Sequence, residues 1–105
     1  MNEPRTTLAD GSPVTPEHRE INPSTGLQKG YVVLSDEERQ KGFVRPVREA
    51  YVHTACGAVT RMSRPIAETF ARDPSFYSGT FCSHCRHHFP LDQFTWDPDG
   101  TTMGT

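Results

Sequence analysis

Two pairs of metal-binding residue types, each spaced by two intervening residues, constrain the fold of this chain more than any other feature. The first pair is His53 and Cys56 in "HTACG", and the second is Cys82 and Cys85 in "FCSHC", with 25 residues between the pairs. Two ligands at this spacing can bind one metal ion from a tight turn, and two such turns complete a tetrahedral site. We call each pair a metal hook. The spacing predicts that both hooks bind a single Zn²⁺.

The composition explains why such a chain would need a metal. Its 105 residues make one domain at most, only 33% of them are hydrophobic, and the mean hydropathy is −0.66. Structural zinc contributes on the order of 10 kcal/mol to the folding of small finger peptides. Gly57 follows the first hook directly, and glycine adopts the positive φ that such turns need without steric cost. Zinc would therefore stabilise a core that is otherwise small.

The identity of the fourth ligand stays open at this point. His84, His87 and His88 cluster beside the second hook, and one of them could replace His53. A metal-free alternative also exists, in which the three cysteines are free or buried thiols. In a variant of it, a Cys82–Cys85 disulfide would leave the remaining cysteine unpaired and sensitive to oxidation.

A catalytic zinc site is disfavoured by the residues around the hooks. Zinc nucleobase deaminases carry a glutamate two residues after the first ligand and a proline before the cysteine pair. Here Ala55 and Ala58 occupy the positions two after His53 and Cys56, and Phe81 stands where the proline would be. Four protein ligands also leave no open position for water. We therefore predict no catalytic residues, and a zinc-dependent hydrolase or deaminase-like enzyme is only a remote alternative.

Charge is distributed unevenly along the chain. Residues 1–38 carry seven acids and three bases, residues 39–72 seven bases and two acids, and residues 73–105 four acids and one base. The basic middle third can face phosphates, but the simpler interpretation is that it faces the acidic ends of the chain or an acidic partner protein. The candidate partner-binding residues are Arg39, Lys41, Arg45 and Arg48.

Pattern and composition divide the chain into four segments. Residues 1–30 are rich in proline and glycine and lack apolar periodicity, which predicts an extended arm without a core. Residues 31–50 read as a short helix with a lead-in segment, residues 51–97 as the zinc-ribbon domain, and residues 98–105 as a loose tail. The expected fold class is α+β, a small zinc ribbon with one helix between the two metal hooks.

Two helices are predicted from their terminal residues. Residues 35–42 have a capping serine at Ser35 and acids in the first turn. Residues 63–73 have an apolar stripe and end before Pro74, because the residue before a proline is pushed out of the helical region. Apolar side chains in residues 88–96 are expected to supply about half of the core.

The chain shows no run of about 20 apolar residues that would span a bilayer, and its beginning lacks the basic and apolar regions of a secretory signal. We therefore expect a reducing cytoplasm, where paired cysteines more often bind metal than form structural disulfides.

The last two-thirds of the chain, from about Leu34 to Trp96, resembles small uncharacterised zinc-ribbon-like proteins of tailed bacteriophages and prophages. The matching pieces are "LSDEERQKGFVRPVR", "YVHTACGAVT", "AETFARDPSFYSGTFCSHC" and "FPLDQFTW". The resemblance implies a phage origin and supports one ligand set, which comprises His53, Cys56, Cys82 and Cys85. It implies no established activity.

From these observations we expect a non-enzymatic, zinc-stabilised protein-binding module, a minor structural or accessory component of a larger assembly such as the virion. Its expected location is the virion or the host cytoplasm, with no membrane partner and no small-molecule substrate. The alternative is a zinc ribbon that binds nucleic acid or regulates transcription in the infected host. Phe76, Tyr77 and Phe81 could stack on bases, but we expect them to pack against the helix at 63–73.

Overall fold

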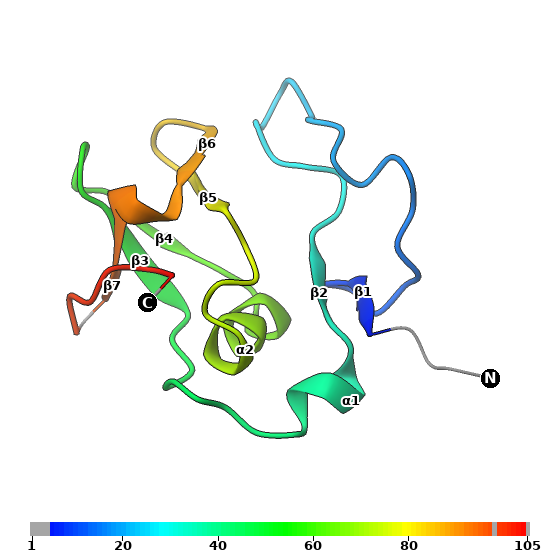
Figure 1. Cartoon of the computed structure of the whole chain (residues 1–105). Helices are drawn as coiled ribbons and strands as arrows, with labels where there is room; N and C mark the ends of the chain where they lie inside the picture. The colour runs from blue at the N-terminus through cyan, green and yellow to red at the C-terminus, as the bar shows by residue number, and fades with distance from the viewer. Residues whose placement is uncertain (1–4, 98, 105) are drawn as a thin grey trace.

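The computed structural model describes residues 5–97 and 99–104, in which short antiparallel strands alternate with two α-helices (Figure 1). This mixture confirms the α+β class. The elements are β1 (Thr6–Leu8), β2 (Val32–Leu34), α1 (Asp36–Arg39), β3 (Ala50–His53), β4 (Val59–Arg61), α2 (Arg64–Arg72), β5 (Gly79–Cys82), β6 (His87–Pro90), the 3₁₀ turn η1 (Leu91–Gln93) and β7 (Phe94–Asp97).

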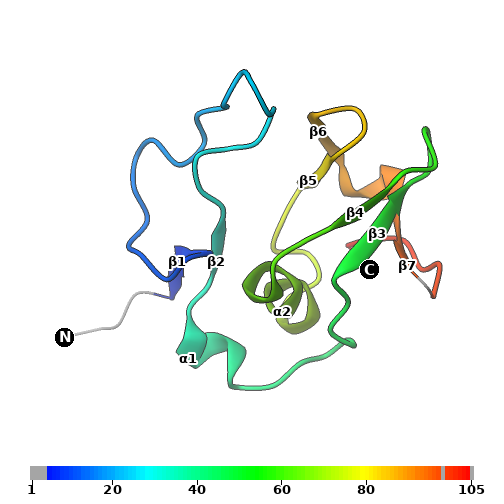
Figure 2. The ribbon, with the colours of Figure 1, turned by 180° about the vertical axis from the view of Figure 1, so that it is seen from behind.

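The strands form three small sheets. The central sheet has the order β4-β3-β7 and is antiparallel throughout, with Tyr51 opposite both Thr60 and Trp96. β5 pairs with β6, and β1 pairs with β2. Seen from behind in Figure 2, the central sheet and the β5–β6 pair lie on one side of α2, and the β1–β2 pair lies on the other.

An aromatic core lies where the central sheet meets α2. Phe94 and Trp96 alternate with more exposed residues along β7, so that both side chains point inward. Trp96 packs edge-on against Phe70 of α2 at 5.2 Å between ring centroids, and Tyr51 packs edge-on against Phe94 at 5.4 Å. These residues confirm that the segment 88–96 supplies a large part of the core.

The α2 helix matches its prediction closely. It begins after Ser63, has a proline in its first turn and ends at Arg72, with Asp73 outside the helical conformation. One buried residue was not anticipated. Thr69 is fully buried; its hydroxyl donates to the Pro65 carbonyl at 2.8 Å and accepts from the Leu34 amide at 3.1 Å. This hydroxyl therefore links α2 to β2.

The α1 helix is shorter than predicted, with a single turn. The predicted cap is present, because the Ser35 hydroxyl accepts a hydrogen bond from the Glu38 amide at 3.3 Å. Gln40 still has helical backbone angles, and two residues later Gly42 adopts a φ of +112°. An isolated turn of this length has little stability of its own.

The N-terminal segment differs from the predicted free arm in residues 5–30. β1 in this segment pairs with β2, and the intervening chain packs onto the rest of the fold at Gly26. A Cβ atom at Gly26 would lie 2.2 Å from the carbonyl oxygen of Arg86 in the second hook. Backbone pairing of this kind needs few apolar residues, so the composition gave no indication of it. Residues 1–4 of the predicted arm lie outside the described residues.

The C-terminal segment also differs from the prediction. Thr102 forms an isolated bridge to Thr95, the Met103 amide donates to the Phe94 carbonyl at 3.0 Å, and the Met103 side chain is only 2% exposed. Residues 99–104 therefore fold back onto β7 and are not a loose tail. Residues 98 and 105 of that predicted tail lie outside the described part of the chain.

Candidate metal centre

The structure brings the two predicted hooks together. The ligand atoms of His53, Cys56, Cys82 and Cys85 all lie within 4.8 Å of one another, close enough to bind one metal ion. The first hook lies at the turn between β3 and β4, and the second at the turn between β5 and β6. His53 and Cys82 are buried, whereas the other two cysteines are exposed at the surface. The site therefore joins two separate sheets.

Individual distances within this group are short. The Cys56 Sγ lies 3.6 Å from the Cys82 Sγ and 3.4 Å from the Nδ1 of His53. The Cys85 Sγ lies 3.8 Å from the same nitrogen. No disulfide links the three cysteines. Each donor atom therefore faces the interior of the same small volume.

The backbones of the two hooks follow the same course. The carbonyl of His53 accepts a hydrogen bond from the Gly57 amide at 2.7 Å, and the carbonyl of Cys82 accepts one from the Arg86 amide at 2.8 Å. Gly57 has a φ of +74° and Arg86 a φ of +56°. The predicted role of Gly57 is confirmed. The matching role of Arg86 was missed, because a positive φ is uncommon at residues other than glycine.

The imidazole of His53 is held in a fixed orientation. Its ring packs against both Phe89 and Phe94, at centroid distances of 4.5 and 4.7 Å. Its Nε2 lies 3.0 Å from the Oε1 of Gln93. Because an amide oxygen can only accept, the proton lies on Nε2 and the lone pair of Nδ1 faces the thiols. Gln93 therefore selects the tautomer that can bind a metal through Nδ1.

Gln93 itself was not predicted as part of the site. It lies in η1, 40 positions after His53 in the chain, and no spacing rule connects the two. Its backbone carbonyl also accepts a hydrogen bond from the Thr54 amide at 2.9 Å. One residue thus orients both the ring and the backbone of the first hook.

The neighbouring histidines take other positions. Within the described part of the chain, none of these histidines belongs to the group that could hold a metal. The Nε2 of His88 lies 2.9 Å from the Tyr31 hydroxyl oxygen. The His87 ring packs edge-on against Phe89, at 5.4 Å between ring centroids. His84 is exposed. The structure therefore groups His53 with the cysteines.

The thiols of the second hook differ in acidity. Burial disfavours the Cys82 thiolate and so raises the pKa of this thiol. Hydrogen bonds to its sulfur have a larger, opposite effect; they come from the Cys85 backbone, the Cys56 thiol and the His84 backbone. Together they lower the pKa of Cys82 to about 7. The pKa of Cys85 is raised to about 11, by desolvation and by its hydrogen bonds to the other two thiols. A bound metal would displace the protons that the cluster retains.

The second hook is anchored to the central sheet. The Ser83 amide donates to the Thr60 hydroxyl at 3.0 Å, and the two hydroxyls are also 3.0 Å apart. Since Thr60 belongs to β4, these contacts hold β4 and β5 side by side at the metal site. The second hook is therefore positioned by hydrogen bonds to the central sheet as well as by its own turn.

Two of the predicted partner-binding residues have partners inside the fold. Arg39 donates to the carboxylate of Glu68 at 2.6 Å and to the carbonyl of Leu34 at 3.0 Å, and its side chain is only 14% exposed. Arg48 binds the Asp99 carboxylate at 2.8 Å and lies 4.5 Å above the Trp96 ring. Both charges therefore have partners inside the fold. The contact of these two arginines with a partner protein stays a prediction.

The other two predicted residues lie on the surface. Lys41 forms an exposed ion pair with Glu38 at 3.0 Å, and Arg45 is exposed. Lys41 and Arg48 thus pair with acids from the acidic ends of the chain, as the simpler interpretation expects, whereas Glu68, the partner of Arg39, belongs to the basic third itself. Phe76, Tyr77 and Phe81 are all partly buried, and the Tyr77 ring lies 4.7 Å from Phe70 of α2.

Comparison with known proteins adds no relative. Searches against protein-family models, curated protein sequences and solved structures each returned no match to this chain. Within residues 5–97 and 99–104, no helix has the length and apolar character needed to cross a bilayer. Functional inference therefore depends on the metal centre and on the surfaces of the fold.

Proposed function

We propose that the chain is a zinc-stabilised, non-enzymatic protein-binding module, and the observation that carries this proposal is the geometry of the four donors. In a tetrahedral site with Zn–S of about 2.3 Å and Zn–N of about 2.0–2.1 Å, neighbouring sulfurs lie about 3.8 Å apart and sulfur and nitrogen about 3.6 Å apart. The closest Sγ–Sγ distance is 3.6 Å, and the two Sγ–Nδ1 distances are 3.4 and 3.8 Å. These distances fit the edges of such a tetrahedron.

Zinc is the metal that this donor set favours. Thiolates and a neutral imidazole in a tetrahedral arrangement are typical of Zn²⁺, whereas Mg²⁺ and Ca²⁺ take oxygen ligands. Three thiolates and one Zn²⁺ have a net charge of −1. Zinc-binding histidines in proteins usually donate their second ring N–H to an acceptor that orients the ring. The hydrogen bond from His53 to Gln93 is a contact of this kind. We assign the site to Zn²⁺ on these grounds.

The zinc would be structural and the fold a zinc ribbon. All four tetrahedral positions are taken by protein side chains, so no position remains for a reactive water. The hooks occupy the turns of two antiparallel pairs, β3–β4 and β5–β6, and β7 adds a third strand to the first pair. This arrangement supports the ribbon assignment. The metal would tie the two pairs together.

The protein-binding role is supported by the small size of the domain and by the absence of an open metal position. The phage origin expected from the sequence favours a component of a virion or another phage assembly. The alternative is nucleic-acid binding, which the excess of bases in residues 39–72 favours. The ion pairs of Arg39 and Arg48 within the fold count against it.

Elemental analysis tests the metal assignment. Protein purified without added metal should contain about one zinc per chain. Cys82→Ser should abolish zinc binding and cooperative folding, whereas His84→Ala, a change in the same turn outside the donor group, should preserve both. A chelator-treated protein that keeps a cooperative unfolding transition would overturn the structural role of the metal.

Two measurements test the partner class. Mass spectrometry of purified phage particles should detect the chain as a minor component if it is a virion protein. Titration with single- and double-stranded DNA and RNA should give no binding tighter than about 10⁻⁵ M at physiological salt, which is within the non-specific range. A sub-micromolar, strongly salt-dependent affinity would replace protein binding with nucleic-acid binding.

A further inference from the structure

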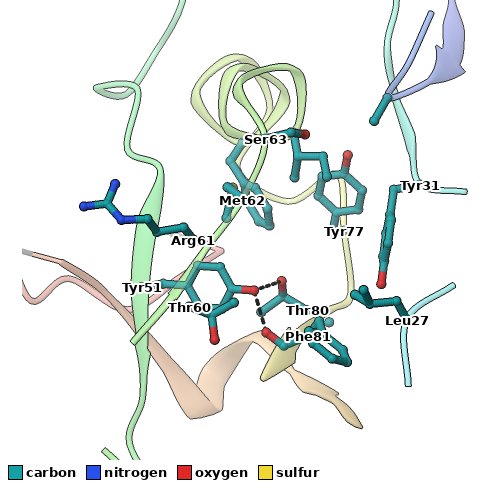
Figure 3. A pocket seen from close by; sticks show the side chains of 14 residues that line it. Leu27, Tyr31, Tyr51, Thr60, Arg61, Met62, Ser63, Tyr77, Thr80 and Phe81 are labelled. Atoms are coloured by element: carbon teal, nitrogen blue, oxygen red, sulfur yellow. Dashed lines mark hydrogen bonds between the residues drawn. The ribbon is translucent and has the colours of Figure 1, made fainter. Parts of the chain in front are cut away.

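An apolar cavity of about 290 Å³ lies between the N-terminal segment and the rest of the fold (Figure 3). Leu27 and Tyr31 of the N-terminal segment lie on one side of it, and Tyr51 and Met62 lie on the other. None of the four metal-donor residues is among its lining residues. The cavity is therefore separate from the metal centre, at a junction between two parts of the fold, where small-molecule sites often occur.

Apolar side chains around this cavity are incompletely covered by the protein. Leu27 is 39% exposed, and Tyr31, Met62, Tyr77 and Phe81 are only partly buried. Single exposed apolar residues are common on protein surfaces, but these residues meet around one concave site. An apolar occupant would remove their surface from water, which is favourable.

The hydroxyl groups in the wall have partners within the protein. The Tyr51 hydroxyl donates to the Phe81 carbonyl and accepts from the Thr80 hydroxyl, as the dashed lines in Figure 3 show. The Tyr77 hydroxyl donates to the Val32 carbonyl. Burial raises the pKa of both tyrosines. The wall therefore offers ring faces and aliphatic groups to an occupant.

The lining residues turn no charged group into the cavity. Among the described residues, the lining includes no Asp or Glu. Its one cation is Arg61, whose guanidinium points away from the cavity in Figure 3. Arg61 follows Thr60 in β4, and successive side chains of a strand point to opposite faces, so that Thr60 is buried and Arg61 exposed. Because a charge without a partner is unfavourable in apolar surroundings, the wall favours an uncharged occupant.

The backbone around the cavity is already engaged in pairing. The Ala9 amide donates to the Tyr31 carbonyl at 2.8 Å, and β5 pairs with β6. On the outer side of β4, the Thr60 hydroxyl accepts from the Ser83 amide. A peptide that entered the cavity would bury its own main-chain polar groups, which need hydrogen-bond partners. These contacts favour a free small molecule over a segment of a partner protein.

The size and the wall of the cavity define the class of molecule. An engineered cavity of about 150 Å³ binds a benzene ring, and pockets for drug-sized ligands begin at about 300 Å³. A volume of about 290 Å³ therefore suits one or two rings and is too small for a nucleotide cofactor. Aromatic molecules pack well edge-on or offset against other rings, and the thioether of a methionine such as Met62 adds favourable contact with a ring.

We propose that this cavity binds a small, uncharged aromatic molecule of one or two rings, which packs against the rings of Tyr31, Tyr51 and Tyr77. This inference goes beyond the proposed protein-binding function and does not depend on it. Because the walls come from both parts of the fold, the occupant would also hold the N-terminal segment against the central sheet and α2.

The test is a titration of the isotope-labelled full chain, as purified, with indole as the probe, followed by NMR. Saturable shifts should centre on the amides of Tyr31, Thr80 and Phe81, with a dissociation constant below about 1 mM. Nuclear Overhauser effects should connect the indole to the lining tyrosine rings. Indole carboxylate and tryptamine, an anionic and a cationic relative, should bind at least about tenfold more weakly than indole.

Four variants locate the binding. Ala9→Phe adds a ring at a lining position and should abolish indole binding, and Leu27→Ala removes part of the wall and should weaken it about 3- to 10-fold. Val14→Ala is the matched control, because Val14 is 40% exposed, compared with 39% for Leu27, and lies outside the cavity lining. This control and Arg61→Gln should both leave binding unchanged. Amide spectra and metal content show whether each variant is folded.

Several outcomes would overturn the assigned site. They are the absence of saturable shifts, equal binding of the two charged relatives, and an equal effect of Leu27→Ala and Val14→Ala. The last pair decides the question even if Ala9→Phe fails to fold. A dimer in solution that Ala9→Phe dissociates would assign the cavity to a second copy of the chain. Loss of a partner protein from Ala9→Phe, without indole binding to the native chain, would assign it to that partner. Failure of the proposed function would show separately, as tight nucleic-acid binding or as absence from phage particles.

Discussion

The contact between His53 and Gln93 leads to a quantitative prediction about metal affinity. Replacing Gln93 with alanine removes the acceptor that lies 3.0 Å from the Nε2 of His53. The ring would still pack against Phe89 and Phe94, but its buried N–H would have no partner. Nothing would then favour the tautomer that binds a metal through Nδ1. Substitution of such outer contacts lowers metal affinity about 10- to 100-fold, which is about 1.4–2.7 kcal/mol. We expect a loss of zinc affinity in this range.

The assay is competition for zinc against a chromophoric chelator of known affinity at pH 7. Gln93→Glu retains an acceptor and makes it anionic, which raises the basicity of the imidazole, so this variant should bind zinc at least as tightly as the native protein. Asp92→Ala changes the exposed neighbour in η1 and serves as the matched control. The fluorescence of Trp96, the single tryptophan in the chain, reports whether each variant is folded.

Two results would refute this reasoning. A zinc affinity of Gln93→Ala within about twofold of the native value would show that the stacking rings alone orient the imidazole. An equal loss in the alanine and glutamate variants would show that Gln93 acts through packing. The Thr54 amide bonds the backbone carbonyl of residue 93, so neither substitution removes that anchor of the first hook.

Three further predictions concern the rest of the fold. Burial raises the pKa of Tyr51 from 10.0 to about 12, so the stabilisation by its neutral form is present below about pH 10 and lost as the pH rises through 12. Tyrosinate absorbance at this residue should appear only with unfolding, and a midpoint near 10 in folded protein would contradict this. Met103→Ala should lower the free energy of unfolding by about 2–5 kcal/mol in denaturant titrations, because the side chain is buried; a loss below about 0.5 kcal/mol would mean that the C-terminal segment is detached. Arg48→Glu should cost about 1–3 kcal/mol by breaking the pair with Asp99, while exposed Arg45→Glu costs less than about 0.5 kcal/mol. If both variants lowered the free energy of unfolding by the same small amount and Arg48→Glu also lost partner binding, Arg48 would be a partner-contact residue.

The parts of the structure that were predicted correctly depend on short-range pattern. The two hooks are visible because two-residue spacing is local, and the turn after His53 needs the glycine that the chain supplies at Gly57. The α2 helix was located by its apolar stripe and by the proline that follows it. Tetrahedral geometry predicted that the two hooks meet, but it left the choice of the histidine donor open.

The features that were missed depend on contacts between distant parts of the chain. Gln93 meets His53 only after β7 pairs with β3, and Met103 becomes buried only after the last residues fold back on Phe94. The partners of Arg39 and Arg48 lie 29 and 51 positions away. Net charge over a segment cannot show that its bases are neutralised by acids brought close in the folded state.

The close approach of Gly26 to the carbonyl of Arg86 has a consequence for local opening of the protein. The N-terminal segment lies against the residue that follows the second hook, and a bound metal would hold that hook in place. Amide hydrogens of the two regions should therefore exchange with solvent as one cooperative unit, and the exchange rate should depend on whether the metal site is occupied. The occupancy of the metal centre would control how often residues 5–30 are released and become accessible to a protease.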